Sequence, residues 1–152
     1  FCIVFYNNIQ AQCVGGQSSS MSPVGPYSSG DIVTVTYTLN NFDGGSGNNW
    51  IHAFDIDYGP GWSSIAPVSA PANPGGSNGN WIWDLNHVYT LPNPNITFGP
   101  GYRFINSTNN QNYGTSSDGP FTLSFELTVG CVTVSENLFV DITVYGDCET
   151  GG

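Results

Sequence analysis

The chain contains no lysine and a single arginine, Arg103, in 152 residues. Against 11 Asp and Glu this leaves a formal net charge of −10 and a pI near 4.1. Binding to the phosphates of a nucleic acid requires Lys or Arg, and so does electrostatic attraction to an anionic membrane. The composition therefore excludes a nucleic-acid-binding protein and a protein held on membranes by a basic patch.

Charged side chains of either sign are scarce. They make up 8% of the chain, whereas an ordinary soluble domain has about 25%. Solubility must come from Asn, Ser and Thr and from the diffuse negative charge. This balance is typical of a protein that works outside the cell, at a surface or in a fibre, rather than of a cytosolic enzyme.

Helical and membrane-spanning patterns are also missing. No apolar run approaches the ~20 residues of a transmembrane helix, and apolar residues never keep helical spacing for long without a Gly or Pro between them. The 20 glycines and 10 prolines interrupt helices and favour short strands joined by tight turns. With 39% hydrophobic and 14% aromatic residues, the chain has enough apolar side chains for the core of one domain.

Alternating apolar and polar residues identify the strands. In the segment 31–40, residues from Val33 to Leu39 place an apolar side chain at every second position, and the segment 121–129 repeats the pattern. Shorter strands are expected over 50–58 and 81–84. We predict an all-β fold, an antiparallel β-sandwich of Ig-like or jelly-roll-like type with about 7–9 strands.

The strand pattern also sets the expected domain organisation. We expect one β-sandwich domain over 31–146, a linker or extended segment over 13–30 before it, and a short tail over 147–152 after it. Residues 63–80, rich in Pro, Ser, Ala, Asn and Gly, are expected to form a loop. Residues 1–12 are expected to be an apolar N-terminal strand or the remnant of a leader.

The first six residues are all bulky, and this run has two interpretations. An apolar run followed by a short polar stretch and Ala11 resembles the end of a secretory signal peptide. A retained strand would instead have to bury its side chains, and burial in a neighbouring subunit would be strand addition. Under the second interpretation the residues of self-assembly are Phe1, Ile3, Val4, Phe5 and Tyr6.

Four cysteines lie near the two ends of the chain, at Cys2, Cys13, Cys131 and Cys148. An even number of cysteines without zinc-ligand spacing favours disulfides and an oxidising, extracellular compartment. Three pairings are open. We favour Cys2 with Cys13 and Cys131 with Cys148, and a link between an N-terminal and a C-terminal cysteine remains an alternative.

Two aspartates form the densest acidic group. Asp55 and Asp57 share one face of the expected strand, about 6.5–7 Å apart along it, a separation at which paired-carboxylate glycosidases work. No further element predicts the cleft that a glycosidase needs. A calcium site that includes Asp43 is the stronger functional interpretation, because Ca²⁺ takes oxygen ligands. The interpretation we favour over both is a pair of solvated carboxylates on an outer face.

Motifs of enzymes are absent from the chain. His52 and His87 are the only histidines, and neither stands near a cysteine or near the other. The pattern Gly-x-Ser-x-Gly occurs at 75–79, but inside the Pro-, Asn- and Gly-rich segment and with no helical pattern after it, as a nucleophile elbow would need, and no Gly-rich phosphate loop occurs. We therefore predict a protein that is not an enzyme and that has no cofactor, calcium excepted.

Aromatic residues in or beside loops provide a second kind of candidate site, made of Trp62, Trp81, Trp83 and Tyr102. Flat rings can stack on sugars, and the abundant Asn side chains could form hydrogen bonds with the hydroxyl groups of a sugar. The structural alternative is that the tryptophans fill the core of the sandwich, where large buried rings are common. A carbohydrate-binding module that uses these residues is our alternative function.

Several short segments occur together along the chain. They are Ala-Gln before Cys13, Ser-Gly-Asp-Ile-Val-Thr-Val-Thr-Tyr at 29–37, Trp-Ile-His at 50–52, Gly-Pro-Gly-Trp at 59–62, Trp-Ile-Trp at 81–83 and the closing Gly-Asp-Cys-Glu-Thr-Gly-Gly at 146–152. In these the chain resembles the secreted surface proteins of Bacteroidota-type bacteria. The resemblance implies a surface, adhesive or filament-forming role and supplies no catalytic residues.

These observations lead to one expectation about function. We expect a non-enzymatic extracellular structural protein, a subunit or adhesive module of a bacterial surface filament, which assembles by N-terminal strand addition. Its partners would be further copies of itself, other surface proteins or glycans. Nucleic acid and insertion into a membrane are not expected.

Overall fold

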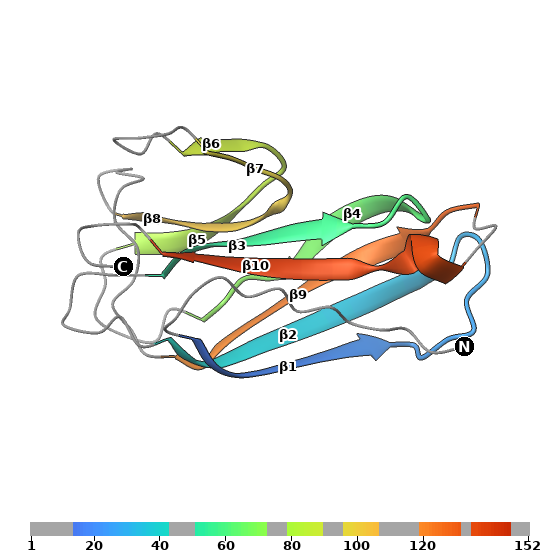
Figure 1. The fold of residues 1–152 in the computed structure, drawn as a ribbon, viewed down its shortest axis with the longest axis horizontal. Helices are drawn as coiled ribbons and strands as arrows, with labels where there is room; N and C mark the ends of the chain where they lie inside the picture. Colours follow the sequence, from blue (N-terminus) through green and yellow to red (C-terminus); the bar gives the residue numbers. More distant parts are fainter. Residues whose placement is uncertain are drawn as a thin grey trace.

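A computed structural model describes residues 14–42, 51–72, 79–89, 96–106, 119–131 and 135–146. Two four-stranded antiparallel sheets face each other, and the single helical element in these ranges is the short 3₁₀ helix η1 (Ser135–Leu138) (Figure 1). Within the same ranges there is no helix with the length and apolar character to span a membrane. The predicted all-β antiparallel sandwich is confirmed, and the eight strands of its two sheets fall within the expected number.

The first sheet has the order β1-β2-β9-β4, and the second has the order β10-β3-β8-β5. The bounds are β1 (Val14–Ser22), β2 (Ile32–Phe42), β9 (Phe121–Val129) and β4 (Trp62–Ser69) in the first sheet, and β10 (Val140–Gly146), β3 (Ile51–Tyr58), β8 (Gly101–Asn106) and β5 (Gly79–Asp84) in the second. A hairpin of β6 (His87–Tyr89) and β7 (Ile96–Phe98) lies outside the second sheet (Figure 1). Consecutive strands alternate between the sheets from β2 to β5 and again from β8 to β10, so these connections cross from one sheet to the other.

The core lies between the inner faces of the two sheets. Every second residue of β2 from Val33 to Leu39 is buried, as are the alternate residues of β9 from Phe121 to Val129. The ring of Phe54 on β3 joins the layers, with its centroid 6.0 Å from that of Tyr37 on β2. The alternation read from the sequence therefore marks the buried faces of these two strands.

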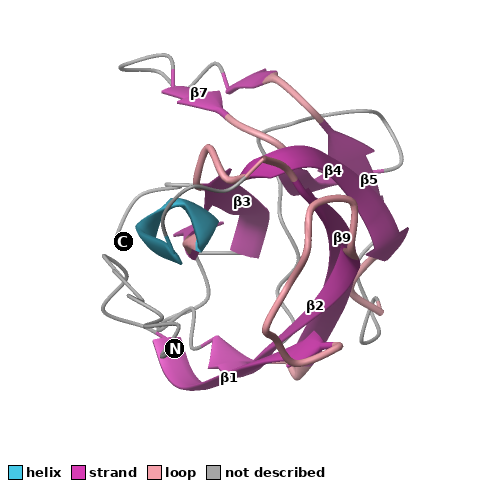
Figure 2. Cartoon of the chain, turned by 90° about the vertical axis from the view of Figure 1, so that its right-hand side faces the viewer, coloured by secondary structure: helices cyan, strands magenta, loops and turns pink. Residues whose placement is uncertain are grey.

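Contacts between the sheets align their strands in pairs. The contact between Tyr37 and Phe54 stacks β2 on β3, and the Tyr102 hydroxyl on β8 donates to the backbone oxygen of Ser124 on β9 at 2.9 Å. It follows from the strand orders that β1 and β10 bound one side of the sandwich, whereas β4 and β5 bound the other. Figure 2 shows the sandwich end-on, with β4 and β5 together at one side and β1 with η1, which precedes β10, at the other.

Two strands lie in segments for which the sequence predicted a linker or a loop. The expected linker over 13–30 contains β1, which pairs with β2 from Val14 opposite Phe42 to Ser22 opposite Thr34, and the expected loop over 63–80 contains β4. The sandwich therefore includes Val14–Ser22, which the sequence assigned to a linker before it. Neither segment has the apolar alternation of a half-buried strand, because each is an edge strand held mainly by backbone pairing to one neighbour.

Candidate functional site

Two of the four aromatic residues proposed to bind a ligand are buried deep in the core. The indole N–H of Trp62 donates to the backbone oxygen of Phe139 at 3.2 Å, and the ring lies 6.1 Å from that of Tyr27. Trp81 packs between rings of both sheets, with its centroid 5.3 Å from Phe54. Both tryptophans therefore have the structural role given above as the alternative.

The other two aromatic residues form an edge-to-face pair. Tyr102 is 3% exposed, and burial raises the pKa of its hydroxyl to about 12. Trp83 is half-buried and lies against it, with ring centroids 5.0 Å apart. The expected flat platform for a sugar is therefore not present on the surface, because three of its four rings lie inside the sandwich.

Acidic side chains gather on the outer face of the second sheet. Asp57 on β3 lies directly opposite Asp141 on β10, and Asp55, two residues before Asp57, lies opposite Thr143. Asp55 and Asp57 thus share a face, as the strand period predicts, and β10 adds a third carboxylate beside them. Like charges directly opposite each other destabilise an antiparallel pair. The carboxylates of β3 and β10 therefore repel one another when they are ionised.

Asp55 is the most perturbed of these carboxyl groups. Burial raises the pKa of Asp55 to about 6, the charge of Asp57 adds to the rise, and hydrogen bonds from the backbone of Gly99 and Ile56 oppose it. Its Oδ1 atom is enclosed and has no hydrogen-bond partner in the described part of the chain. Burial, followed by the charge of Asp57, also raises the pKa of Asp141.

A calcium site is not assembled from the acids that the structure describes. Within residues 14–146, gaps excepted, no three His, Cys, Asp or Glu side chains are grouped so that they could hold a metal ion. Asp43, the third proposed ligand, lies outside the described residues. Asp55 and Asp57 are therefore described as neighbouring carboxylates and not as a cation site.

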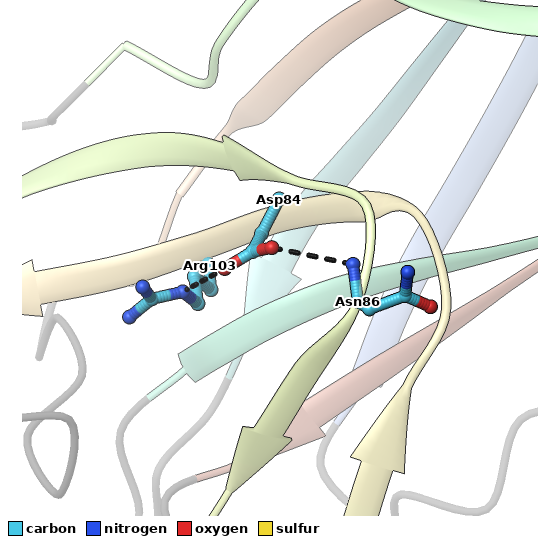
Figure 3. Close-up of polar contacts among 3 residues, drawn as sticks. All are labelled: Asp84, Asn86 and Arg103. Carbon is cyan, nitrogen blue, oxygen red and sulfur yellow. Dashed lines mark hydrogen bonds and ion pairs between the residues drawn. The ribbon is translucent and has the colours of Figure 1, made fainter.

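The single arginine is engaged in an ion pair between β8 and β5, on the strand next to β3, where Arg103 lies opposite Ala53. Arg103 Nε on β8 donates to Asp84 Oδ2 on β5 at 2.9 Å (Figure 3). Asp84 Oδ1 also accepts the backbone N–H of Asn86 at 3.2 Å, where the chain leaves β5. The one positive side chain of the protein is thus paired with Asp84 and does not neutralise the acids of β3 and β10.

The cysteines and the N-terminal run are largely outside the described residues. Cys131 follows β9 and is an exposed, free thiol, so the favoured pair of Cys131 with Cys148 is not observed. Cys2, Cys13 and Cys148 lie outside the described residues. So do the proposed residues of self-assembly, which are Phe1, Ile3, Val4, Phe5 and Tyr6.

The hydrogen-bond pattern reveals which backbone groups face the free edge of β10. The Gly59 N–H donates to the Phe139 oxygen at 2.9 Å, and this bond fixes the odd-numbered residues of β10 as those bonded to β3. The N–H and C=O groups of Val140, Ile142 and Val144 therefore point away from β3. The side chains of these three residues are buried on the inner face.

Along Val140–Tyr145 the edge of β10 lacks a proline and a bulge, and no described strand pairs with it. Natural edge strands carry Lys, Pro or bulges, or are very short. From Val140 to Tyr145 the pairing with β3 is regular and the segment contains neither Pro nor Lys, and the register shifts only at Gly146. This edge is therefore a regular template for one more strand.

The edge of β4 is protected. The Gly130 N–H donates to the Gly61 oxygen at 2.7 Å, so that Ile65 and Pro67 are the residues of β4 whose backbone faces outward. Pro67 has no N–H to offer at this edge, and the pairing with β9 shifts register on both sides of it. Both features prevent regular pairing of a further strand.

The edge of β1 is open but polar. By the same alternation its outward-facing backbone groups belong to Gln17, Ser19 and Met21, whose side chains point to the inner face. The Tyr37 hydroxyl donates to Gln17 Oε1 at 2.8 Å, which ties this strand to β2. β1 therefore offers backbone groups to a further strand but little apolar surface.

A scan against protein-family models finds no matching family, and searches of curated proteins and of solved structures find no match. The sequence did not predict that β10 lies at an edge. Its alternating residues contain no proline, but which strand lies at an edge depends on the sheet order.

Proposed function

We propose that this chain is a non-enzymatic extracellular structural protein, a subunit or adhesive module of a bacterial surface filament that assembles through its N-terminal strand. The observation that carries the proposal is the asymmetry between its edges. The edge of β4 is interrupted by Pro67 and two register shifts, while the edge of β10 is regular from Val140 to Tyr145 and pairs with no strand among the described ones. Monomeric β-proteins protect their edges, whereas assembly by strand addition requires an open one.

The distribution of charge supports assembly through the N-terminal segment. The first 30 residues contain no Asp, Glu, Lys or Arg, so the net charge of −10 belongs entirely to residues 31–152. Two folded domains of this charge repel each other at low ionic strength. An uncharged apolar segment that crosses from one copy to the next provides contact without bringing the acidic faces together.

The absence of lysine and the acidic composition support a location outside the cell. A chain with one arginine offers a single cleavage site to trypsin-like proteases. Partners would be further copies of the chain or other surface proteins. The carbohydrate-binding alternative has less support, because Trp62, Trp81 and Tyr102 are buried.

Light scattering and negative-stain microscopy of the full chain test this proposal. We expect polymers at high protein concentration, and we expect Val4→Asp to abolish them because a charge would enter the apolar run. Asn8→Asp is the matched control, since it adds the same charge just outside the run and should leave assembly intact. A full chain that stays monomeric across a wide range of concentration and salt would contradict the proposal.

A further inference from the structure

We propose that β10 is the acceptor edge of the assembly and that it takes residues 1–6 of a second copy as an additional strand of the β10-β3-β8-β5 sheet. This inference rests on the proposed function and adds the place and the partner. It starts from the backbone groups of Val140, Ile142 and Val144, which face away from β3 and have no bonding strand among the described ones.

The length of the incoming segment matches this edge. Six residues in a strand span about 20 Å, and the seven residues of β10 span about 23 Å. Between Val140 and Val144 the outward-facing residues recur every second position, so a six-residue strand can pair with all of them. The remainder of the uncharged segment, from residue 7 onward, is then available to connect the strand to its own domain.

The side chains of the two partners are also complementary. On the inner face, β10 ends the sheet with the apolar row of Val140, Ile142 and Val144, which are 5–6% exposed. Residues 1–6 are all apolar or aromatic, and all but Cys2 are bulky, so the strand presents apolar side chains to this row whichever of its two faces points inward. Burial of aromatic and aliphatic side chains beside such a row adds to the main-chain hydrogen bonds that give strand addition its affinity.

The described strand that faces β10 across the sandwich contributes few apolar side chains to the inner face. Across the sandwich, β1 contributes Gln17, Ser19 and Met21 rather than large apolar side chains. At the other side of the second sheet, by contrast, the indoles of Trp81 and Trp83 already fill the inner face at the edge of β5. The bulky residues of an incoming strand are therefore better accommodated at β10 than at β5.

The charges beside β10 also favour residues 1–6 of a second copy as the partner. Asp141 on β10 lies beside Asp57 on the outer face, so a negatively charged strand would be repelled there. Residues 1–6 carry no charged side chain. A second copy supplies this segment at the same concentration as the acceptor edge, and each copy has one donor and one acceptor, so head-to-tail addition produces an open filament.

Amide hydrogen exchange of the full chain at low and at high concentration tests the acceptor. We expect the N–H groups of Ile142 and Val144 to exchange about tenfold more slowly, or slower still, in the assembled state, with no change at Ser19 or Ile65. Polymers that protect β1, β4 or β5 instead would overturn this inference and leave the proposed function standing. A chain that stays monomeric with Ile142 and Val144 protected at every concentration would show that its own N-terminal segment occupies β10, and would overturn both.

A pair of variants tests the edge independently. Val144→Pro removes an N–H that faces the free edge and breaks no bond to β3, so it should abolish assembly while circular dichroism still reports a folded sandwich. Val144→Ala removes similar side-chain contacts and keeps the N–H, and should assemble. If both variants assemble equally well, β10 is not the acceptor; if Val144→Pro does not fold, the exchange experiment on the unmodified chain decides.

Discussion

Asp55→Asn should stabilise the protein at neutral pH. The pKa of Asp55 rises from 3.8 to about 6 on folding, and each pKa unit corresponds to about 1.4 kcal/mol. The upper limit is therefore about 3 kcal/mol, which solvent screening of the partly exposed carboxyl reduces to about 1–2 kcal/mol. Because the folded pKa is the higher one, the stability that protonated Asp55 contributes is fully present below about pH 4 and is lost as the pH rises through about 6. Asn avoids this loss, so the advantage of the variant develops over the same pH range.

The neighbours of Asp55 also favour stabilisation by the Asn variant. Asp57 on the same strand and Asp141 and Tyr145 on β10 are acidic groups, and the charge of Asp55 contributes to the raised pKa of Tyr145. The nearest cation in the sheet, Arg103, is paired with Asp84. The uncharged amide of Asn therefore avoids the burial of a negative charge among other acids.

Thermal and urea unfolding at pH 4, 5, 6 and 7 measure the effect. For a chain of this length, about 1–2 kcal/mol corresponds to a rise in Tm of about 3–6 °C at pH 7, with almost no difference at pH 4. Glu126→Gln on β9, in the other sheet, is the control, because it removes the same charge away from this face. If both variants raise Tm equally at pH 7, net charge and not the burial of Asp55 controls the stability, and the reasoning is refuted.

Three further predictions concern the core, the ion pair and a close backbone contact. Trp81→Ala should lower the free energy of unfolding by about 3–5 kcal/mol, measured in urea, and Trp83→Ala by clearly less, since its ring is half-buried; equal losses would contradict this packing. Arg103→Gln should cost about 1 kcal/mol, with a smaller loss in 1 M salt; a Tm difference that does not depend on salt would argue against the ion pair with Asp84. Gly101→Ala should lower Tm strongly, because a Cβ there would collide with a backbone oxygen of β3; an unchanged melting curve would disprove that close approach.

The sequence predicted the fold class through two strands in particular. In β2 and β9 the apolar residues alternate with threonine, serine and glutamate over the whole strand. A period of two is set by the backbone geometry of a single strand, so it can be read without knowledge of the neighbours. The same period placed Asp55 and Asp57 on one face.

Other features depended on contacts between distant parts of the chain. β1 is Gly- and Ser-rich and carries no apolar alternation, and β4 contains Pro67, so neither resembles a strand in isolation. Their pairing becomes evident only when β2 and β9 provide neighbours. Trp62 and Trp81 follow the same rule, because the sequence alone does not tell whether a ring beside a turn points into the core or into solvent.

By itself, then, the sequence determined the negative charge, the all-β class, the faces of the main strands and the apolar character of residues 1–6. The tertiary contacts were needed to show that Asp141 faces Asp57, that Arg103 is paired with Asp84, and that β10 and β4 are the outer strands of their sheets among the described ones, with β4 interrupted by Pro67. The physical reason is that composition and side-chain period belong to each segment separately. Strand order and register arise from hydrogen bonds and packing between segments far apart in the chain.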